Sequence, residues 1–215
     1  VSGRKLVKIT RESEHSPHPI DQDSFPLKDA LRSPLVVHEL NSEEEEQDWI
    51  ASQVANDIEQ GMNPLDLMIT GPTGHRERQY YQGMQNSLNR YGIKSLIAGV
   101  DTDPDVFQQD GYVTISPIFR AKGNEAWKVY ACRFHYADDP VFQQEEELHK
   151  RNQAFVALTR ARVWCVVTGE KSPIFQELRA IQQDYPNLVF PAFNRAALRR
   201  NNDDDENETL KENVA

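Results

Sequence analysis

Hydrophobic and polar positions follow two different periods, in alternation, along this chain. Short apolar runs, typical of buried strands, are separated by stretches in which apolar residues recur every three or four positions, as on one face of a helix. This alternation predicts an α/β fold, with a mostly parallel sheet covered by helices on both faces. The apolar runs predict strands at 34–40, 66–70, 93–100, 112–118, 127–134, 163–168 and 188–193.

The helices are marked by their ends as well as by their apolar faces. Asn41 or Ser42 is suited to cap the first helix, because its side chain can accept a hydrogen bond from a free backbone N–H. The acidic run Glu43–Glu46 then falls in the first turn, where negative charge suits the helix dipole, so we interpret it as a helix start and not as a metal site. Helices are expected from there up to Gly61 and at 75–91, 143–162 and 172–185.

Length and composition favour one sizeable domain with tails. The chain has 215 residues, enough for a substantial core. Residues 1–33 are polar and contain several prolines, and we expect an irregular lead-in with a short extended piece at Lys5–Thr10. The domain itself is expected over residues 34–200. Residues 201–215 are rich in Asn, Asp and Glu and predict a disordered acidic tail.

Charge and cysteine content narrow the class of protein. With 24 basic and 34 acidic residues the net charge is −10, which argues against a general polyanion-binding surface but leaves room for a local basic groove. Cys132 and Cys165 lie in apolar runs and predict buried free thiols in a reducing compartment. Neither a signal peptide nor an apolar run of about 18 residues is visible, so the expected location is cytoplasmic and away from membranes. Because the first residue is Val, we expect a piece of a longer protein.

A glycine-containing loop, Gly71-Pro-Thr-Gly74, follows a predicted strand and opens a predicted helix, as a phosphate-binding loop does. Such a loop must end in Gly-Lys-Ser/Thr, because the lysine neutralises phosphate charge and the hydroxyl holds magnesium. Here His75-Arg-Glu77 follows instead, and the chain has no other Walker A motif. A complete P-loop ATPase is therefore excluded. The loop is either a plain strand-to-helix turn or an anion site formed by backbone N–H groups and Thr73.

The segment Arg151–Arg162 predicts a helix that packs one apolar face on the core, with Thr159, Arg160 and Arg162 in its last turn. Taken alone, the segment is best explained as an ordinary core helix. Its part Phe-Val-Ala-Leu-Thr-Arg-Ala-Arg, however, resembles motif VI of UvrD/Rep-type superfamily 1 helicases. In that family the arginine of Thr-Arg-Ala contacts the γ-phosphate of ATP, and the match falls on Arg160. Arginine suits this role because its planar, permanently charged group can meet phosphate oxygens bidentately.

A second segment, Arg120-Ala-Lys-Gly-Asn-Glu125, lies upstream in the order expected of motif V of the same family, between two predicted strands. Alone, it would read as a surface loop. The resemblance implies nucleotide-binding roles for Lys122, Gly123 and Glu125, with the glutamate accepting a hydrogen bond from the ribose. Glycine also permits backbone conformations that other residues avoid. The sequence departs from the family pattern at four positions, Pro117, Phe119, Asn124 and Phe155. These departures affect the DNA contacts more than the nucleotide contacts and indicate a divergent branch.

The resemblance covers about residues 35–195 and implies the second RecA-like domain of such a helicase. ATP and Mg²⁺ would be bound mainly by an N-terminal RecA-like domain of the same polypeptide, and Arg160 would stabilise charge on the transferring γ-phosphate. Single-stranded DNA is the second expected partner, tracked mainly through its phosphates. Its candidate contacts are Thr73, Ser116 and Arg120, whereas Arg76 and Arg78 are equally well explained as solvated helix residues.

Two other readings remain open at this stage. The chain could be a non-catalytic RecA-like module that binds protein partners through its acidic surfaces. Three polar groups converging on one cleft, Lys122, Glu125 and Arg160, speak against that reading. A nuclease-associated domain is the other alternative, but the sequence shows no pattern of paired carboxylates with a lysine.

Overall fold

The structure of the chain is a computed structural model that describes residues 7–10, 35–103, 105–138, 144–184 and 187–190. These residues belong to two compact units. The smaller unit comprises residues 1–22 and 184–215, and the larger one comprises residues 23–183. The larger unit thus ends before the boundary expected at residue 200.

Two short strands define the described part of the smaller unit. Strand β1 (Val7–Thr10) pairs antiparallel with β8 (Asn187–Phe190). A short extended piece was expected at Lys5–Thr10 and a strand at 188–193, but the latter was expected to extend the parallel sheet and instead pairs with β1. The remainder of the predicted lead-in over 1–33 and the acidic tail over 201–215 lie outside the described residues.

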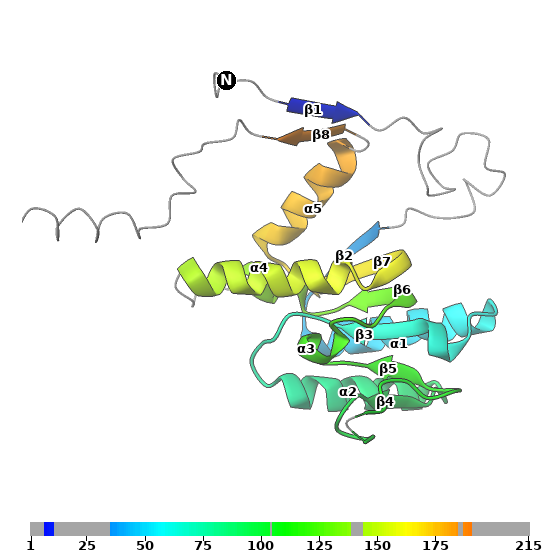
Figure 1. Ribbon diagram of the computed structural model, residues 1–215. Coiled ribbons are helices and arrows are strands. Elements are labelled where there is room, and N and C mark those ends of the chain that lie inside the picture. Colours follow the sequence, from blue (N-terminus) through cyan, green and yellow to red (C-terminus); the bar gives the residue numbers. More distant parts are fainter. Residues whose placement is uncertain (1–6, 11–34, 104, 139–143, 185–186, 191–215) are drawn as a thin grey trace, which may run out of the picture. The chain divides into compact units, whose positions relative to one another are not determined.

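The larger unit is built on a six-stranded sheet in the order β2-β7-β6-β3-β5-β4, which Figure 1 shows from top to bottom. All neighbouring strands in it run parallel. The predicted α/β class with a parallel sheet is therefore confirmed, and the architecture fits the RecA-like fold that the resemblance implied. The strands are β2 (Leu35–Leu40), β3 (Leu67–Thr70), β4 (Ser95–Ile97), β5 (Val113–Ile115), β6 (Ala126–Ala131) and β7 (Ala161–Glu170).

Helices cover both faces of this sheet. One face is closed by α1 and α2, whose Ile50, Val54 and Met84 are fully buried against the strands. The other face is closed by α3, α4 and α5, through small or aromatic side chains such as Ala157 and Phe175. Burial of each large apolar side chain is worth about 1.5–3 kcal/mol, so the two layers stabilise the sheet jointly. The helices are α1 (Glu43–Glu59), α2 (Glu77–Arg90), α3 (Ile118–Ala121), α4 (Gln144–Leu158) and α5 (Pro173–Asp184), with 3-10 helices η3 (Pro64–Asp66) and η4 (Phe134–Asp138).

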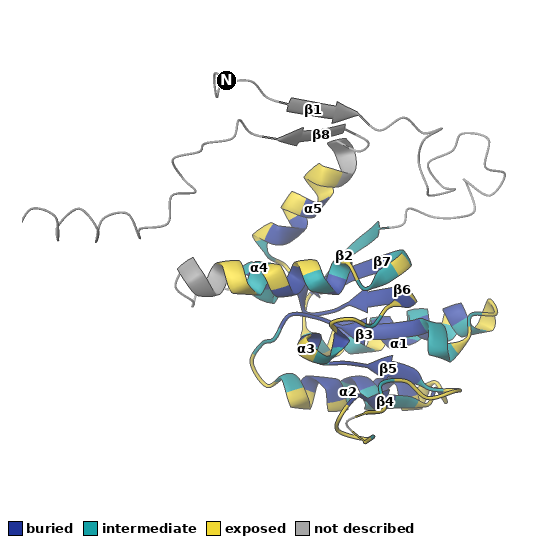
Figure 2. Ribbon diagram, in the orientation of Figure 1, coloured by how far each residue is buried: buried dark blue, intermediate teal, exposed yellow. Residues whose placement is uncertain are grey.

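The central strands are buried on both sides, while α2 and α4 turn alternating exposed positions outward (Figure 2). This pattern explains why the strands appear in the sequence as continuous apolar runs and the helices as periodic ones. In the part of the chain that the structure describes, no helix combines the length and apolar character needed to cross a bilayer.

Several predicted boundaries are corrected by the structure. Ser42 caps α1 as expected, since its hydroxyl accepts a hydrogen bond from Glu45 N at 3.2 Å. The strand predicted at 112–118 stops at Ile115, because the chain turns at Pro117 into the one-turn helix α3, which was not predicted. The helix predicted at 143–162 ends at Leu158, so Arg160 lies in a turn and Arg162 in β7.

Because all strands of the larger sheet are parallel, all of them begin at one edge and end at the opposite edge. We call these the amino edge and the carboxyl edge. Crossovers from β3 run toward β4, whereas the crossover from β6 runs toward β7, so the order of the sheet reverses between the neighbours β3 and β6. Loops at the carboxyl edge beside such a reversal are a common place for ligands in α/β proteins.

Candidate functional site

The segment from Ser116 to Glu125 crosses from the carboxyl edge, where β5 ends, to the amino edge, where β6 begins. Its middle is α3, which packs Ile118 and Ala121 on the core. After α3 the backbone N–H of Asn124 donates to Ala121 O at 3.0 Å, and its side-chain amide donates to Arg120 O at 3.1 Å. The resulting tight loop contains residues 122–125 and is called the 122–125 loop below.

Gly123 occupies the turn of that loop with φ of +90°, a conformation that other residues rarely adopt. A Cβ added at this position would meet no atom within 4 Å. The glycine is therefore required for the backbone conformation, and the space beside it is open. The side chain of Lys122 is exposed next to it.

Arg160 lies in the two-residue turn between α4 and β7. Its guanidinium is half-buried and makes three hydrogen bonds, from Nε to Val156 O at 3.1 Å, from Nη2 to Thr159 Oγ1 at 3.2 Å and from Nη1 to Asn124 O at 3.4 Å. The backbone of the same residue continues the contact, since Ala126 N donates to Arg160 O at 3.0 Å. The Thr-Arg-Ala segment and the 122–125 loop therefore lie directly against each other at the amino edge.

Glu125 takes part in this arrangement through a salt bridge. Arg162 Nε donates to Glu125 Oε2 at 3.1 Å, with both side chains about half exposed. The structure thus brings Gly123, Glu125 and Arg160 together from two segments 36 positions apart. Both charged groups of the set, the Arg160 guanidinium and the Glu125 carboxylate, are occupied by partners within the chain.

The three residues predicted to contact DNA lie toward the opposite, carboxyl edge. The backbone N–H and the hydroxyl of Thr73 donate to Gln153 Oε1 at 2.8 and 2.7 Å. The ammonium group of Lys150 donates to the carbonyl and hydroxyl oxygens of Thr73. The guanidinium of Arg120 packs against Gly99 in the turn after β4. Ser116 is fully buried, with its hydroxyl 3.0 Å from Pro117 O. A side chain buried in this way cannot contact a strand of DNA at the surface, so the prediction for Ser116 is wrong.

The glycines of the Gly71–Gly74 loop serve packing. A Cβ on Gly71 would stand 1.9 Å from Cys132 O, and a Cβ on Gly74 would overlap the ring of Tyr136. The loop is pressed onto the end of β6 and is held from α4, so it does not wrap an open space as a phosphate-binding loop does. Of the two interpretations left open by the sequence, the strand-to-helix turn is the one that this packing favours.

A buried charged cluster at the carboxyl edge was missed by the sequence reasoning. Arg133 is fully buried, with its guanidinium 4.8 Å from the ring centroid of Tyr80 and 4.5 Å from that of Tyr136. Its Nε and Nη2 pair with Glu43 at 3.0 and 2.8 Å, and its backbone N–H donates to Glu46 Oε1 at 2.8 Å. Burial alone would lower the pKa of Arg133, but the charge of Glu43 raises it overall.

Glu46 is the second buried ionisable side chain of the cluster. Thr168 donates its hydroxyl to the same Oε1 at 2.6 Å. Burial raises the pKa of Glu46, and the hydrogen bonds from Thr168 and Arg133 oppose the rise. The signal in the sequence was the spacing of Glu43 and Glu46, which puts both carboxylates on one face of α1. The acidic first turn of α1 therefore not only suits the helix dipole but also binds Arg133 and Thr168 at the carboxyl edge.

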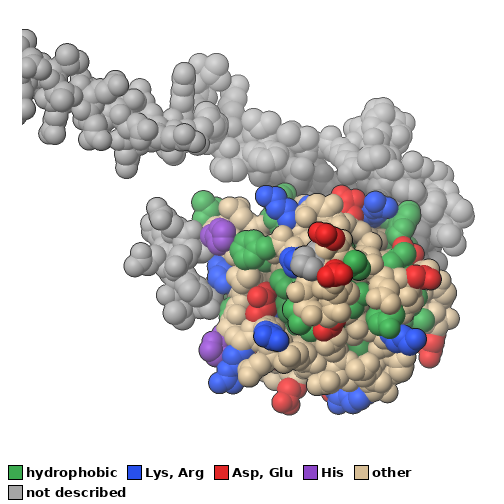
Figure 3. Space-filling model, turned by 60° about the horizontal axis from the view of Figure 1, so that its bottom comes forward, with side chains coloured by type: hydrophobic (Ala, Val, Ile, Leu, Met, Phe, Trp, Pro, Cys, Tyr) green, Lys and Arg blue, Asp and Glu red, His purple; other side chains and the backbone are tan. Residues whose placement is uncertain are grey.

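Three large apolar side chains near α3 and α4 are more than 60% exposed, namely Phe119 at 63%, Leu148 at 63% and Phe155 at 64%. The ring of Phe119 stacks on that of His149, with centroids 6.2 Å apart. Charged side chains of both signs are interspersed on the face in Figure 3, whose described residues form no continuous basic surface. That distribution agrees with the acidic net charge of −10.

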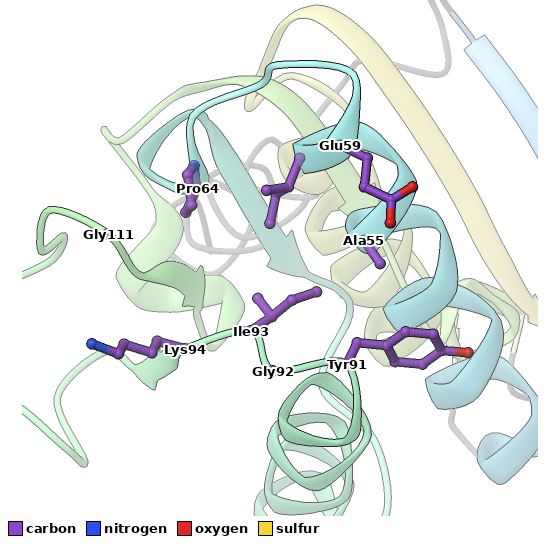
Figure 4. A pocket seen from close by; sticks show the side chains of 9 residues that line it. Ala55, Glu59, Pro64, Tyr91, Gly92, Ile93, Lys94 and Gly111 are labelled. Atoms are coloured by element: carbon purple, nitrogen blue, oxygen red, sulfur yellow. The ribbon is translucent and has the colours of Figure 1, made fainter.

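The hollow shown in Figure 4 lies at the amino edge, between the ends of α1 and α2, and encloses about 380 Å³. Apolar side chains including Ala55 and Ile93 line it, with Glu59 and Lys94 among the residues around it. None of the residues predicted as a site lines this hollow. Among the described residues, no group of three or more His, Cys, Asp and Glu side chains is placed to hold a metal ion.

Comparisons with known proteins add little. No protein-family model matches the chain, and no curated protein matches its sequence significantly. Among solved structures, the chain is similar to the C-terminal domain of a possible DNA helicase from Lactobacillus plantarum WCFS1. The two share 20% sequence identity over 66% of this chain and 79% of that chain, with a TM-score of 0.46. A likeness at this level is too distant to assign a function.

Proposed function

We propose that this chain is the C-terminal motor domain of an ATP-dependent, UvrD-like superfamily 1 DNA helicase or translocase. It would supply Arg160 and the 122–125 loop to an ATP site whose phosphate-binding loop belongs to an N-terminal RecA-like domain. The proposal is carried by one observation, the direct contact of the two motif-like segments at the amino edge through Arg160 Nη1 and Asn124 O. Because β6 and β7 are neighbouring strands, the loops that precede them lie side by side in any case, so the support comes from the residue types that meet there, a guanidinium beside a glycine-containing loop with an exposed lysine and glutamate.

The chemistry assigned to this edge is electrostatic. ATP and Mg²⁺ would be held mainly by the N-terminal domain, and the guanidinium of Arg160 would meet the γ-phosphate, where charge develops during transfer. Glu125 would accept a hydrogen bond from the ribose, in the open space beside Gly123. Lys122 is exposed and its charge would attract the polyphosphate.

Single-stranded DNA would lie at the carboxyl edge, where Thr73 and Arg120 remain the candidate contacts. The segment that carries Arg120 also carries the 122–125 loop, with only the single turn of α3 between the two edges. A closing movement at the ATP site would therefore shift the DNA-facing end of the same segment. Alternating closure and release of this kind is the basis of movement along a strand.

DNA-stimulated ATP hydrolysis by the complete protein, in which this domain is combined with its phosphate-binding partner domain, tests the proposal. We expect Arg160→Ala to reduce turnover at least several hundred-fold with ATP binding retained, because such arginines contribute about 10³–10⁵ in rate. Arg179→Ala is the matched control, since Arg179 is a half-exposed arginine of α5 that pairs with Glu39. An unchanged rate in Arg160→Ala would refute the assigned role.

A second candidate function is a non-catalytic interaction module. The observation that favours it is the exposure of Phe119, Leu148 and Phe155 on α3 and α4, since exposed large apolar side chains can serve a protein-binding surface. Under this alternative, Arg160→Ala would leave all activities of the complete protein unchanged. Replacement of Phe155 by a polar residue would then release a bound partner.

A further inference from the structure

Asn124 stands between the two motif-like segments. Its backbone N–H and side-chain amide bind the last turn of α3, at Ala121 O and Arg120 O. Its own carbonyl points the other way and accepts a hydrogen bond from Arg160. The side chain of Asn124 thus fixes the carbonyl that meets the guanidinium.

The three acceptors of the Arg160 guanidinium differ in origin. Val156 O and Thr159 Oγ1 belong to the end of the same α4 segment and move together with the arginine. Asn124 O belongs to the 122–125 loop. Of these three contacts, only the one to Asn124 O can change when the 122–125 loop moves relative to α4.

We propose that Asn124 is a positioning residue that holds Arg160 folded back onto the 122–125 loop until a nucleotide engages the neighbouring Glu125. The proposal deepens the function proposed above and rests on it for the identity of the ligand. Glu125 would exchange Arg162 for a ribose hydroxyl, the adjoining carbonyl of Asn124 would turn away, and the Arg160 guanidinium would be released toward phosphate.

The strengths of the contacts suit such an exchange. At 3.4 Å the bond from Arg160 to Asn124 O is the longest of the three and near the limit of a hydrogen bond. The Glu125–Arg162 pair is about half exposed on both sides, and exposed pairs of this kind contribute little to stability. A ligand can therefore displace both at low cost, and the neighbouring Gly123 allows the backbone of the loop to turn.

Nuclear magnetic resonance of the Arg160 side chain measures this contact directly on the chain itself. The Nη–H signals, which include the Nη1 group that donates to Asn124 O, are identified by their loss in Arg160→Lys, and their exchange rate with water reports how firmly the guanidinium is held. We expect Asn124→Ala to accelerate this exchange about two- to fivefold, the effect of one weak hydrogen bond. Asn124→Ser, which keeps a donor for Arg120 O, should restore most of the native rate.

Asn63→Ala is the matched control, because Asn63 also binds the backbone of a short turn, at Leu65 N, before a strand begins at the same edge. It should leave the Arg160 signal unchanged. The backbone amide spectrum of every variant verifies that the fold is retained. Unaltered Arg160 exchange in folded Asn124→Ala would overturn the proposal.

Binding of inorganic tripolyphosphate, which has no ribose, supplies a second readout. If Asn124 restrains Arg160, then Asn124→Ala binds tripolyphosphate about two- to fivefold more tightly than the native chain, and adding Arg160→Ala abolishes the gain. If Asn124→Ala bound tripolyphosphate more weakly than the native chain, Asn124 would hold Arg160 ready for phosphate instead of restraining it, and the proposal would be overturned. If tripolyphosphate binds independently of Arg160 and the turnover of the complete protein is unchanged in Arg160→Ala, the proposed function fails, whereas the exchange rates still decide the role of Asn124.

Discussion

Replacing Arg133 by methionine tests the buried cluster that joins α1, α2 and the carboxyl ends of β6 and β7. The substitution keeps most of the volume and removes the charge, so that Glu43 loses two charge-assisted hydrogen bonds and His75 O loses its donor. The contacts of the guanidinium with the rings of Tyr80 and Tyr136 are lost as well. The change therefore removes several favourable contacts at once, without leaving a large cavity.

The magnitude follows from these losses. The bonds to Glu43 are worth about 1.5–3 kcal/mol and each ring contact contributes about 0.5–2 kcal/mol, whereas the carbonyl of the exposed residue His75 can bond to water instead. Two effects oppose these losses. The free-energy cost of burying the Arg133 charge disappears in the variant, and the Glu43 carboxylate, which is 34% exposed, regains contact with water. Removing one partner of a buried pair typically destabilises by about 3–5 kcal/mol, and we expect the lower end.

Urea unfolding followed by tryptophan fluorescence measures this free energy. A loss of about 3 kcal/mol corresponds to a fall in Tm of roughly 6–12 °C for a unit of this size. Arg90→Met is the matched control, because Arg90 pairs with Asp48 on the surface, where both are more than half exposed, and should change stability by less than about 1 kcal/mol. If Arg133→Met were as stable as the native protein, the predicted destabilisation would be refuted, because the contacts of the buried guanidinium would then only offset the free-energy cost of its desolvation.

Three further predictions concern the same unit. Burial raises the pKa of Glu46 above its ordinary value of 4.5, so the folded protein holds this proton more tightly than the unfolded chain and loses stability as the pH rises from that value. The stability gained by Glu46→Gln should therefore be larger at pH 7 than at pH 4.5 in urea titrations. Gly71→Ala should destabilise by more than about 3 kcal/mol in the same assay, because backbone blocks its Cβ, whereas Gly83→Ala meets only a flexible glutamine. Burial raises the pKa of Cys165 to about 12 and also raises that of Cys132, so a disulfide reagent should label both only as fast as the protein unfolds.

Most of the fold could be predicted from the sequence because its signals are local. Apolar runs located the strands of the sheet, and Ser42 marked the start of α1, since a hydroxyl that accepts a backbone N–H acts within one turn. The order of the strands was not predictable in this way. Nothing near β8 shows that it pairs with β1 and not with the larger sheet, because that pairing joins residues about 180 positions apart.

The sequence nominated residues for a candidate site but could not predict their contacts. The motif-like patterns selected Gly123, Glu125 and Arg160, and the fold brings these together. Ser116 was misjudged, because a polar residue at the end of a strand looks exposed in the sequence, whereas α3 folds over and buries it. Arg133 was overlooked because a buried arginine is rare and its partners come from distant elements.

The position of β2 in the sheet has a consequence for synthesis on the ribosome. Although β2 comes first in the larger unit, it pairs with β7, whose last residue is Glu170. From Leu40 to Glu170 the ribosome adds 170 − 40 = 130 residues, which takes roughly 7–26 s at about 5–20 residues per second. During that interval the apolar segment Leu35–Leu40 has no strand to pair with, and such segments associate readily with other chains. In a nascent chain the segment Leu35–Leu40 therefore stays available for pairing with other chains until β7 emerges.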